Sequence, residues 1–344
     1  MTSKLLIYID HHDGMITPAS REALGAAHQL AKASGAQVEA IVLGMDTGLA
    51  AEEAARSGAA RVFQANAPDL ADFRAEVYAG VVASLTAGAE AVLLPDNGRT
   101  RELAAILAVD LEAGLIPDVI ELEVREGAIV AKRAIYSGKV HTSIRGTGRK
   151  PVVLTLRSRA FPAFSGEGSP GKIEGIEVPP IQALSEVLSY QTSQEAVSLA
   201  DAGIIVAGGR GLSNNLALEA PSDLTDPEAI EKWKAMEGFK QLQELAGVMG
   251  AAVGATRAVV DAGYVDYNHQ IGQTGKVVSP DLYLAFGISG AIQHLAGIRS
   301  ARTIIAVNKD AEAPIFKSAR FGIVGDMHKV IPALMDAFKE MSAQ

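Results

Sequence analysis

The chain of 344 residues contains no cysteine. This absence excludes disulfide bonds, thiolate catalysis, zinc ribbons and cysteine-ligated iron–sulfur clusters, so any redox chemistry has to use a bound cofactor. Aromatic residues make up only 5% of the chain, whereas 48% of the residues are hydrophobic and 34 are glycines. Such a composition is typical of an α/β enzyme or cofactor carrier, and the length favours two domains.

Basic clusters and long apolar runs are also missing. The formal net charge is −9 and no run of Lys and Arg interrupts it, which argues against a nucleic-acid partner. No uninterrupted apolar stretch approaches the ~20 residues that span a bilayer. The chain begins almost directly with the strand-like segment Lys4–Asp10, without the pattern of a signal or transit peptide. We therefore expect a cytoplasmic protein that is not membrane-embedded.

Strand and helix patterns alternate through the first part of the chain. Strands are expected at residues 5–9, 38–43, 60–64 and 91–94, and helices at residues 18–33, 49–57, 69–87 and 101–113. This alternation predicts a mostly parallel sheet covered by helices on both faces. Four short strands without helices follow at residues 119–124, 129–135, 140–144 and 152–155, and we expect them to extend the same sheet as antiparallel edge strands.

The second part restarts the alternation after a segment rich in proline and glycine at residues 161–180. Strands are expected at residues 203–207, 255–260, 282–286, 303–307 and 321–324, with helices near residues 226–249 and 327–341. Asp226 and Pro227 suit the N-cap and first turn of the first of these helices. The sequence thus predicts two α/β domains, residues 1–195 and 196–344.

The most informative segment is Pro280–Gly297, PDLYLAFGISGAIQHLAG. A buried strand leads there into a Gly-Ile-Ser-Gly turn and then into a helix-like segment. Small residues at such a turn leave backbone N–H groups free and place them beside the positive end of the helix dipole. This arrangement favours an anionic ligand such as a phosphate group.

Four loops of the second part carry polar or glycine-rich residues directly after a strand, at 208–211, 256–257, 289–294 and 308–310. Ligands collect at the carboxyl ends of the strands in an open parallel sheet, so we expect these loops to meet at one edge. None of them contains GxGxxG or GxxxxGK[ST], which disfavours an NAD-dependent dehydrogenase and a P-loop protein.

Several runs of this second part resemble the electron transfer flavoprotein alpha family. They are GATRAVVDAGYV from Gly254, QIGQTGKVVSPDLYLAFGISGAIQHLAG from Gln270, IIAVNKDAEAPIF from Ile304 and FGIVGD from Phe321. The resemblance covers roughly residues 200–340 in continuous order. It implies a nucleotide-binding-like N-terminal domain that contributes to the subunit interface and holds no flavin, and a Rossmann-like C-terminal domain that binds one FAD.

The resemblance also implies a set of cofactor-binding residues and no catalytic residue. Arg210, Thr256 and Arg257 would lie beside the flavin ring or its pyrophosphate, and Asn308 and Asp326 would approach the adenosine end. The loop 271–274 would wrap the ring, with the Thr274 hydroxyl near flavin N5, and the segment 289–294 would hold phosphate and ribityl groups. These two segments contribute Ile271, Gly272, Gln273, Thr274, Ser289, Gly290, Ala291, Ile292, Gln293 and His294.

His294 would reach the O2 edge of the flavin. Reduction places negative charge near N1 and O2 of a flavin, so a protonated imidazole or a nearby guanidinium would stabilise it. Asp326 also suits a helix N-cap. Arg320 and Gly325 depart from the family pattern, since an acidic residue and an alanine are usual there.

The implied function is electron transport rather than conversion of a substrate. Paired with a beta subunit, the chain would take electrons from acyl-CoA and related dehydrogenases of fatty acid β-oxidation and pass them singly to a membrane quinone oxidoreductase. AMP is expected in the beta subunit. Two alternatives stay open: an electron-bifurcating relative that uses NADH and a second flavin, and a flavin-free scaffold of the same fold.

The run His11-His12-Asp13 superficially resembles a metal site. Adjacent residues of an extended segment point to opposite sides, and no further ligands accompany them. We therefore expect no metal.

Overall fold

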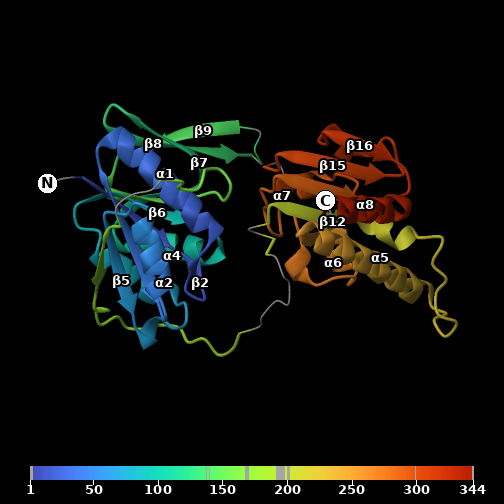
Figure 1. Ribbon diagram of the computed structural model, residues 1–344, viewed down its shortest axis with the longest axis horizontal. Coiled ribbons are helices and arrows are strands. Elements are labelled where there is room, and N and C mark those ends of the chain that lie inside the picture. Colours follow the sequence, from blue (N-terminus) through green and yellow to red (C-terminus); the bar gives the residue numbers. More distant parts are fainter. Residues whose placement is uncertain are drawn as a thin grey trace. The chain divides into compact units, whose positions relative to one another are not determined.

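The computed structural model describes residues 3–136, 138, 140–166, 170–190, 198–199, 202–298 and 300–342. The chain divides into two units, Met1–Gln191 and Thr192–Gln344 (Figure 1). The boundary predicted between residues 195 and 196 lies outside the described residues.

The N-terminal unit contains a nine-stranded sheet in the order β11-β5-β4-β1-β6-β10-β7-β8-β9. Its strands are β1 (Lys4–Ile9), β4 (Gln37–Gly44), β5 (Arg61–Asn66), β6 (Ala89–Pro95), β7 (Ala113–Arg125), β8 (Ala128–Ile135), β9 (Val140–Arg145), β10 (Arg149–Leu156) and β11 (Lys172–Gly175). Neighbouring strands from β11 to β7 are parallel, whereas β7, β8 and β9 are antiparallel. The short strands β2 (His11–His12) and β3 (Met15–Ile16) form a separate ribbon.

Helices cover both faces of the parallel part of this sheet, as predicted. Leu5, Ile7 and Ile9 of β1 pack on the face covered by α1 (Pro18–Ser34) and α2 (Gly48–Arg56). Leu6 and Tyr8 point to the opposite face, against α3 (Ala75–Ser84) and α4 (Gly98–Asp110). Side chains alternate along a strand, so these apolar strand residues serve two cores.

One strand pairing and two element boundaries in this unit differ from the sequence-based prediction. β10 is not an antiparallel edge strand: it returns to the interior of the sheet and lies parallel between β6 and β7. An apolar run shows that a strand is buried but does not identify its neighbours. β7 begins at Ala113, so the preceding helix ends earlier than expected, and the helix predicted at residues 69–87 is a short 3-10 turn, η1 (Pro68–Leu70), followed by α3.

The C-terminal unit contains a parallel five-stranded sheet in the order β13-β12-β14-β15-β16. Its strands are β12 (Ile204–Gly208), β13 (Ala252–Ala255), β14 (Leu282–Phe286), β15 (Thr303–Asn308) and β16 (Phe321–Val324). Its helices are α5 (Pro227–Met249), α6 (Arg257–Asp261), α7 (Ile292–Ile298) and α8 (Met327–Ser342), with 3-10 turns η2 (Arg210–Asn214), η3 (Tyr267–His269) and η4 (Pro314–Lys317). The chain runs from β12 outward to β13 and then back to β14, which places a topological switch point between β12 and β14.

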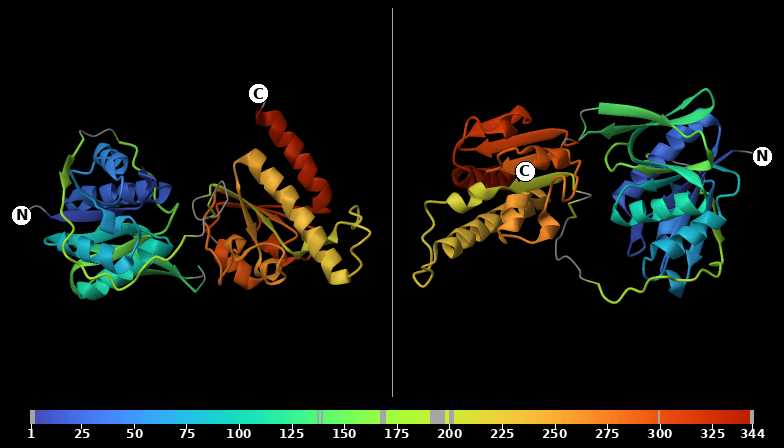
Figure 2. Two further views of the ribbon diagram at one scale, coloured as in Figure 1. Left: turned by 90° about the horizontal axis from the view of Figure 1, so that it is seen from below. Right: turned by 180° about the vertical axis from the view of Figure 1, so that it is seen from behind.

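The two faces of this sheet are also covered by helices. The helices α5, α6 and α8 pack on one face, with α5 and α8 side by side in Figure 2. Residues of α7 and η4 pack on the other face. The side chain of Asp226 accepts a hydrogen bond from the Ala229 amide, which confirms the predicted N-cap of α5.

The strand predicted at residues 255–260 is wrong. β13 ends at Ala255, and α6 begins two residues later, after Thr256 in extended conformation. The short apolar run Ala258-Val259-Val260 belongs to this helix, where only Val259 is buried. Periodicity cannot separate a strand from a helix in a run of this length.

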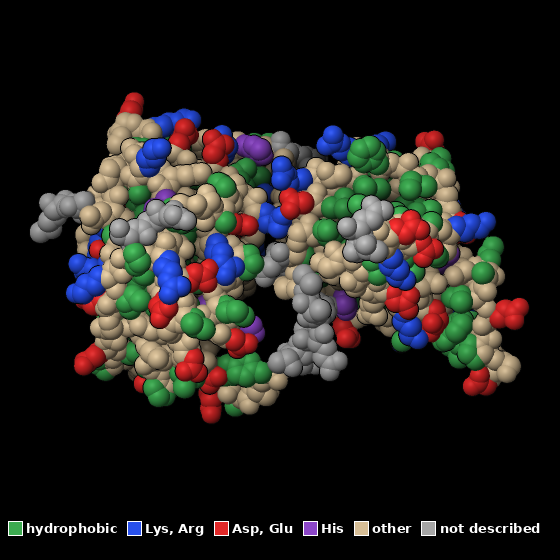
Figure 3. Space-filling view, in the orientation of Figure 1, with side chains coloured by type: hydrophobic (Ala, Val, Ile, Leu, Met, Phe, Trp, Pro, Cys, Tyr) green, Lys and Arg blue, Asp and Glu red, His purple; other side chains and the backbone are tan. Residues whose placement is uncertain are grey.

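Among the described residues, no helix combines the length and the apolar character that crossing a membrane requires. On the face drawn in Figure 3, acidic and basic side chains are interspersed.

Candidate functional site

A cavity of about 540 Å³ lies at the carboxyl edge of the C-terminal sheet. This volume falls within the range of roughly 300–1,000 Å³ that is typical of small-molecule sites. It is lined by residues that follow β12, β13 and β14 and by the loop 271–274: Gly209, Arg210, Thr256, Arg257, Ala258, Asp261, Ile271, Gly272, Gln273, Thr274, Gly287, Ile288, Ser289, Ala291, Gln293 and His294. The cavity thus occupies the switch point between β12 and β14, where open α/β sheets bind ligands. Three of the four predicted loops meet here.

Two guanidinium groups lie in the wall of the cavity. Arg210 begins η2 directly after β12, and Arg257 begins α6 directly after β13. Arg257 Nε lies 3.0 Å from a carboxylate oxygen of Asp261. Both side chains of this pair are more than half exposed, so its net contribution to folding is small and Arg257 stays available to an anionic ligand. The described lining residues include two cations and one carboxylate.

The loops after β12 and β14 contact each other through their backbones. The Gly209 amide donates to the Phe286 carbonyl at 2.9 Å. A Cβ atom on Gly209 would lie 2.2 Å from the Gly287 carbonyl oxygen, and Gly287 itself has φ +61°. Because only glycines allow this approach and this left-handed turn at low cost, they shape the wall between the two loops.

The loop 271–274 closes another side of the cavity. Its position is set by backbone hydrogen bonds from Ile271 N to Ala255 O at 2.9 Å and from Gln273 N to Gln293 O at 2.8 Å. The buried Gln270 amide donates to Thr274 Oγ1 at 3.2 Å. Since Thr274 Oγ1 accepts this bond, the hydroxyl proton is left to donate to a ligand.

His294 contributes to the wall of the cavity and is only 5% exposed. Its Nδ1 lies 3.0 Å from the Ile271 carbonyl oxygen, and its Nε2 lies 2.9 Å from the Tyr283 hydroxyl. Burial lowers the pKa of His294 from 6.5 to about 4, although the bond to Ile271 acts in the opposite direction. Burial thus favours the neutral imidazole near pH 7 in the chain without a ligand, whereas the sequence analysis considered a protonated ring beside the reduced flavin.

Four of the predicted residues do not line this cavity. Gly290 is buried, and a Cβ atom there would lie 2.3 Å from the Ile315 amide nitrogen. Ile292 is 67% exposed. Asn308 donates to the Ile288 carbonyl at 3.0 Å and lines a smaller cavity of about 80 Å³. Through this hydrogen bond, Asn308 holds the loop after β14 without lining the main cavity.

Asp326 stands at the start of α8. A carboxylate oxygen accepts a hydrogen bond from the His328 amide at 3.1 Å, and the other lies 3.3 Å from Lys309 Nζ. Partial burial raises the pKa of this carboxyl, but the His328 amide and the Lys309 ammonium lower it to a net value below the ordinary one. Asp326 thus has the capping position that the sequence indicated.

The sequence analysis did not name five lining residues as site residues. They are Gly209, Ala258, Asp261, Gly287 and Ile288. Gly209 lies inside the glycine-rich loop that the sequence did indicate, and the spacing of four residues between Arg257 and Asp261 is the signal for a helical ion pair. The sequence did not indicate a role for Tyr283, because this residue lies within an apolar strand. Its contact with His294 arises only when β14 and α7 pack together.

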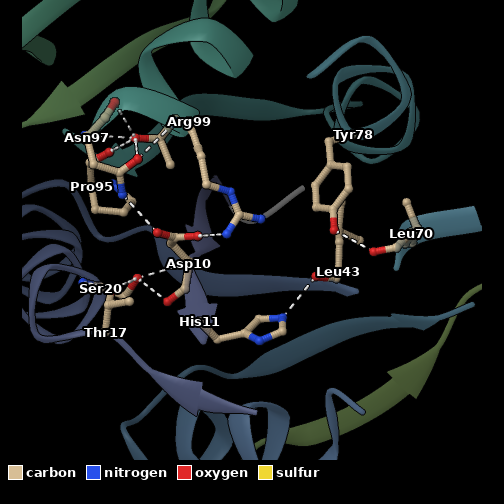
Figure 4. A network of polar contacts seen from close by, with 11 residues as sticks. Asp10, His11, Thr17, Ser20, Leu43, Leu70, Tyr78, Pro95, Asn97 and Arg99 are labelled. Atoms are coloured by element: carbon tan, nitrogen blue, oxygen red, sulfur yellow. Dashed lines mark hydrogen bonds and ion pairs between the residues drawn. The ribbon is translucent and has the colours of Figure 1, made fainter. Parts of the chain in front are cut away.

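The N-terminal unit has a switch point of its own, between β1 and β6, and a network of its own polar side chains lies there (Figure 4). Asp10 is 6% exposed. Its carboxylate accepts a hydrogen bond from Asn97 Nδ2 at 2.8 Å and lies 3.7 Å from a guanidinium nitrogen of Arg99. The Arg99 guanidinium also lies 4.5 Å above the Phe73 ring. A buried carboxylate at this position disfavours a phosphate group by charge repulsion.

No group of three or more His, Asp or Glu side chains suited to a metal ion occurs among the described residues. His11 is engaged instead with the Leu43 carbonyl, 3.0 Å from its Nε2.

Comparison with known proteins identifies both parts of the chain. Residues 5–181 match the family described as electron transfer flavoprotein domain, and residues 232–299 match the electron transfer flavoprotein FAD-binding domain. The electron transfer flavoprotein subunit alpha of Bacillus subtilis (strain 168) is 38% identical over 348 residues and covers 99% of each chain. The electron transfer flavoprotein subunit alpha of Thermoanaerobacterium thermosaccharolyticum is 34% identical, and the match covers 97% of each chain. The mitochondrial subunit alpha of Oryza sativa subsp. indica is 36% identical and covers 96% of this chain and 89% of its own.

Proposed function

Since this chain belongs to the electron transfer flavoprotein alpha family, we propose that the cavity between β12 and β14 holds its FAD. As a member of this family, the chain is an electron carrier with a FAD-binding domain. Alpha subunits of the family normally pair with a beta subunit. The position of the cavity carries the proposal, because residues 232–299 of the FAD-binding match contribute most of its wall.

The residues of the cavity fit this cofactor. At the Gly209–Gly287 contact the wall carries no side chain, so a flat ring or a pyrophosphate can lie against the backbone there. Arg210 and Arg257 supply positive charge, and the Thr274 hydroxyl and the Gln273 and Gln293 amides supply hydrogen-bond donors. This donor set suits a phosphorylated, redox-active ring better than a neutral apolar ligand.

FAD supplies the acceptance and release of electrons. The protein supplies binding, orientation and electrostatics. In the proposal, the two guanidinium groups counter the negative charge that the cofactor carries and gains. The loop 271–274 covers one side of the ring, and its hydrogen bonds to α7 and β13 hold it there.

For the partners we propose acyl-CoA and related flavin dehydrogenases as electron donors and a membrane quinone oxidoreductase as acceptor, in the cytoplasm of a bacterial-type cell. The family membership supports a redox relay of this kind. AMP belongs to the beta subunit in this proposal.

Co-expression of the chain with its beta subunit tests the function. The purified pair should show flavin absorbance and release one FAD and one AMP per heterodimer, and an acyl-CoA dehydrogenase with its substrate should reduce it. Two FAD with reduction by NADH would favour the bifurcating relative. A colourless pair that does not take up added FAD would favour the flavin-free scaffold.

A further inference from the structure

The C-terminal unit has a second cavity, of about 310 Å³, which we call the amino-edge pocket. Its lining residues come from α7, from β15 and from the segments that lead into β15 and β16 (Figure 1), and they include Leu295, Ile298, Arg302, Ile304, Ser318 and Arg320. Arg302 and Arg320 directly precede β15 and β16. Since the strands are parallel, the pocket lies at the edge of the sheet opposite to the proposed FAD site, and the two cavities share no lining residue.

The wall of the amino-edge pocket carries charge of one sign. Arg302 and Arg320 are the charged residues among its described lining residues, which include no carboxylate. The chain as a whole has a formal net charge of −9. Two cations around one small cavity are therefore a local exception, and they attract an anion to this place.

Both guanidinium groups are available to a ligand. Arg302 Nη1 lies 3.3 Å from a carboxylate oxygen of Asp281, but this pair is largely exposed and contributes little by itself. The Arg320 guanidinium lies 5.8 Å from the Phe321 ring and takes part in no ion pair among the described residues.

The backbone holds both arginines in place. The Arg302 amide donates to the Pro280 carbonyl at 3.0 Å, and the Arg320 amide donates to the Ile304 carbonyl at 2.8 Å. Since these bonds fix the starting point of each side chain, less freedom is lost when the two guanidinium groups close on a ligand.

The rest of the pocket is mainly apolar. Ile298 is fully buried and Ile304 is 8% exposed, and Leu295 of α7 adds a third aliphatic side chain to the wall. The exposed Ser318 contributes a hydroxyl group. The pocket thus combines a charged rim with an apolar floor, which suits a ligand with an anionic head and an apolar body.

We propose that the amino-edge pocket binds a phosphate monoester with a short apolar body. The Arg302 and Arg320 guanidinium groups each offer paired N–H donors, and the Ser318 hydroxyl offers one more. A phosphate monoester has three terminal oxygens and a charge of about −1.5 to −2 near pH 7, so it uses these donors more fully than a carboxylate with two oxygens and one charge. The apolar body lies against Ile298 and Ile304.

Methyl NMR of the chain paired with its beta subunit tests this site, with pentyl phosphate as the probe. The chain carries carbon-13 at its isoleucine δ1 methyl groups, and Ile298→Val and Ile304→Val assign the two signals of the pocket. Pentyl phosphate should shift both signals to saturation, with a dissociation constant on the order of 1 mM. Inorganic phosphate, which lacks the apolar body, and pentanoate, which lacks the phosphate head, should both bind more weakly.

A pair of variants separates the pocket from general attraction by positive charge. Arg320→Gln should weaken the binding of pentyl phosphate by about tenfold to a hundredfold, because one charged donor is lost, and Arg320→Lys should restore part of it. Lys317→Gln is the matched control: Lys317 is an exposed cation at the end of η4 that does not line the pocket. It removes the same charge and should leave the dissociation constant within about twofold of wild type.

Three results would overturn the proposal. They are Ile298 and Ile304 signals that do not move with pentyl phosphate, equal losses of binding in Arg320→Gln and Lys317→Gln, and pentanoate that binds as tightly as pentyl phosphate. The flavin absorbance of the pair should stay constant during the titration. A pair without flavin would contradict the proposed function, but the two isoleucine signals would still decide the amino-edge pocket.

Discussion

The stability of the C-terminal unit should depend on pH because His294 is buried as a neutral ring. Its pKa falls from 6.5 to about 4 on folding. Below pH 6.5 the unfolded chain takes up a proton at this residue and the folded chain does not, so unfolding becomes more favourable as the pH falls. The stabilisation is therefore fully present above pH 6.5 and is lost progressively down to about pH 4. A shift of this size corresponds to about 3 kcal/mol.

The comparison that isolates this effect is wild type against His294→Gln. A glutamine can bond both the Tyr283 hydroxyl and the Ile271 carbonyl but does not titrate, so other titrating groups of the unit cancel in the difference. The chain has a single tryptophan, Trp233 on α5. Urea unfolding followed by its fluorescence therefore reports on the C-terminal unit alone.

Between pH 7 and pH 4, the free energy of unfolding of wild type should fall by about 3 kcal/mol more than that of His294→Gln. A difference between the two proteins that stays constant over this range would refute the reasoning, because it would mean that His294 titrates alike in the folded and unfolded chain.

Three further predictions concern the wall of the cavity and the N-terminal unit. Gly209→Ala should destabilise the C-terminal unit by about 1–3 kcal/mol, because its Cβ would meet a backbone oxygen, and should weaken FAD binding; urea unfolding and FAD titration check this, and Gly247→Ala on an open face of α5 should have neither effect. Arg257→Gln should weaken FAD binding tenfold to a hundredfold, since charged hydrogen bonds contribute about 1.5–3 kcal/mol, whereas the exposed Arg302→Gln, outside this cavity, should leave the titration unchanged. Asn97→Ala removes both the cap of α4 and a bond to a buried carboxylate, so it should cost about 1–2 kcal/mol; circular dichroism should show this loss while the Trp233 transition stays in place.

The strands and helices that carry a clear pattern could be predicted from the sequence. The strand at residues 282–286 and the strand at residues 321–324 have the predicted bounds, and Asp226 caps α5 as its position before Pro227 indicated. The pairing of β10 could not be predicted, because the neighbours of a buried strand are set by the path of the whole chain.

The site could be predicted to a similar extent. The glycine-rich and polar loops after β12, β13 and β14 meet because the carboxyl ends of parallel strands share one edge. The state of His294 could not be predicted, because burial and the Tyr283 hydroxyl come from different elements of the fold. Asn308 ends β15 and Asp326 follows β16. Both lie away from the main cavity, because β15 and β16 are one and two strands further from the switch point than β14.

A crystal structure of the purified pair with the beta subunit tests the central claim most directly. The account predicts one flavin in the C-terminal unit, with its ring or pyrophosphate in contact with Arg257 and the loop 271–274. Flavin density beside Asp10 at the switch point between β1 and β6, or none between β12 and β14, would contradict it.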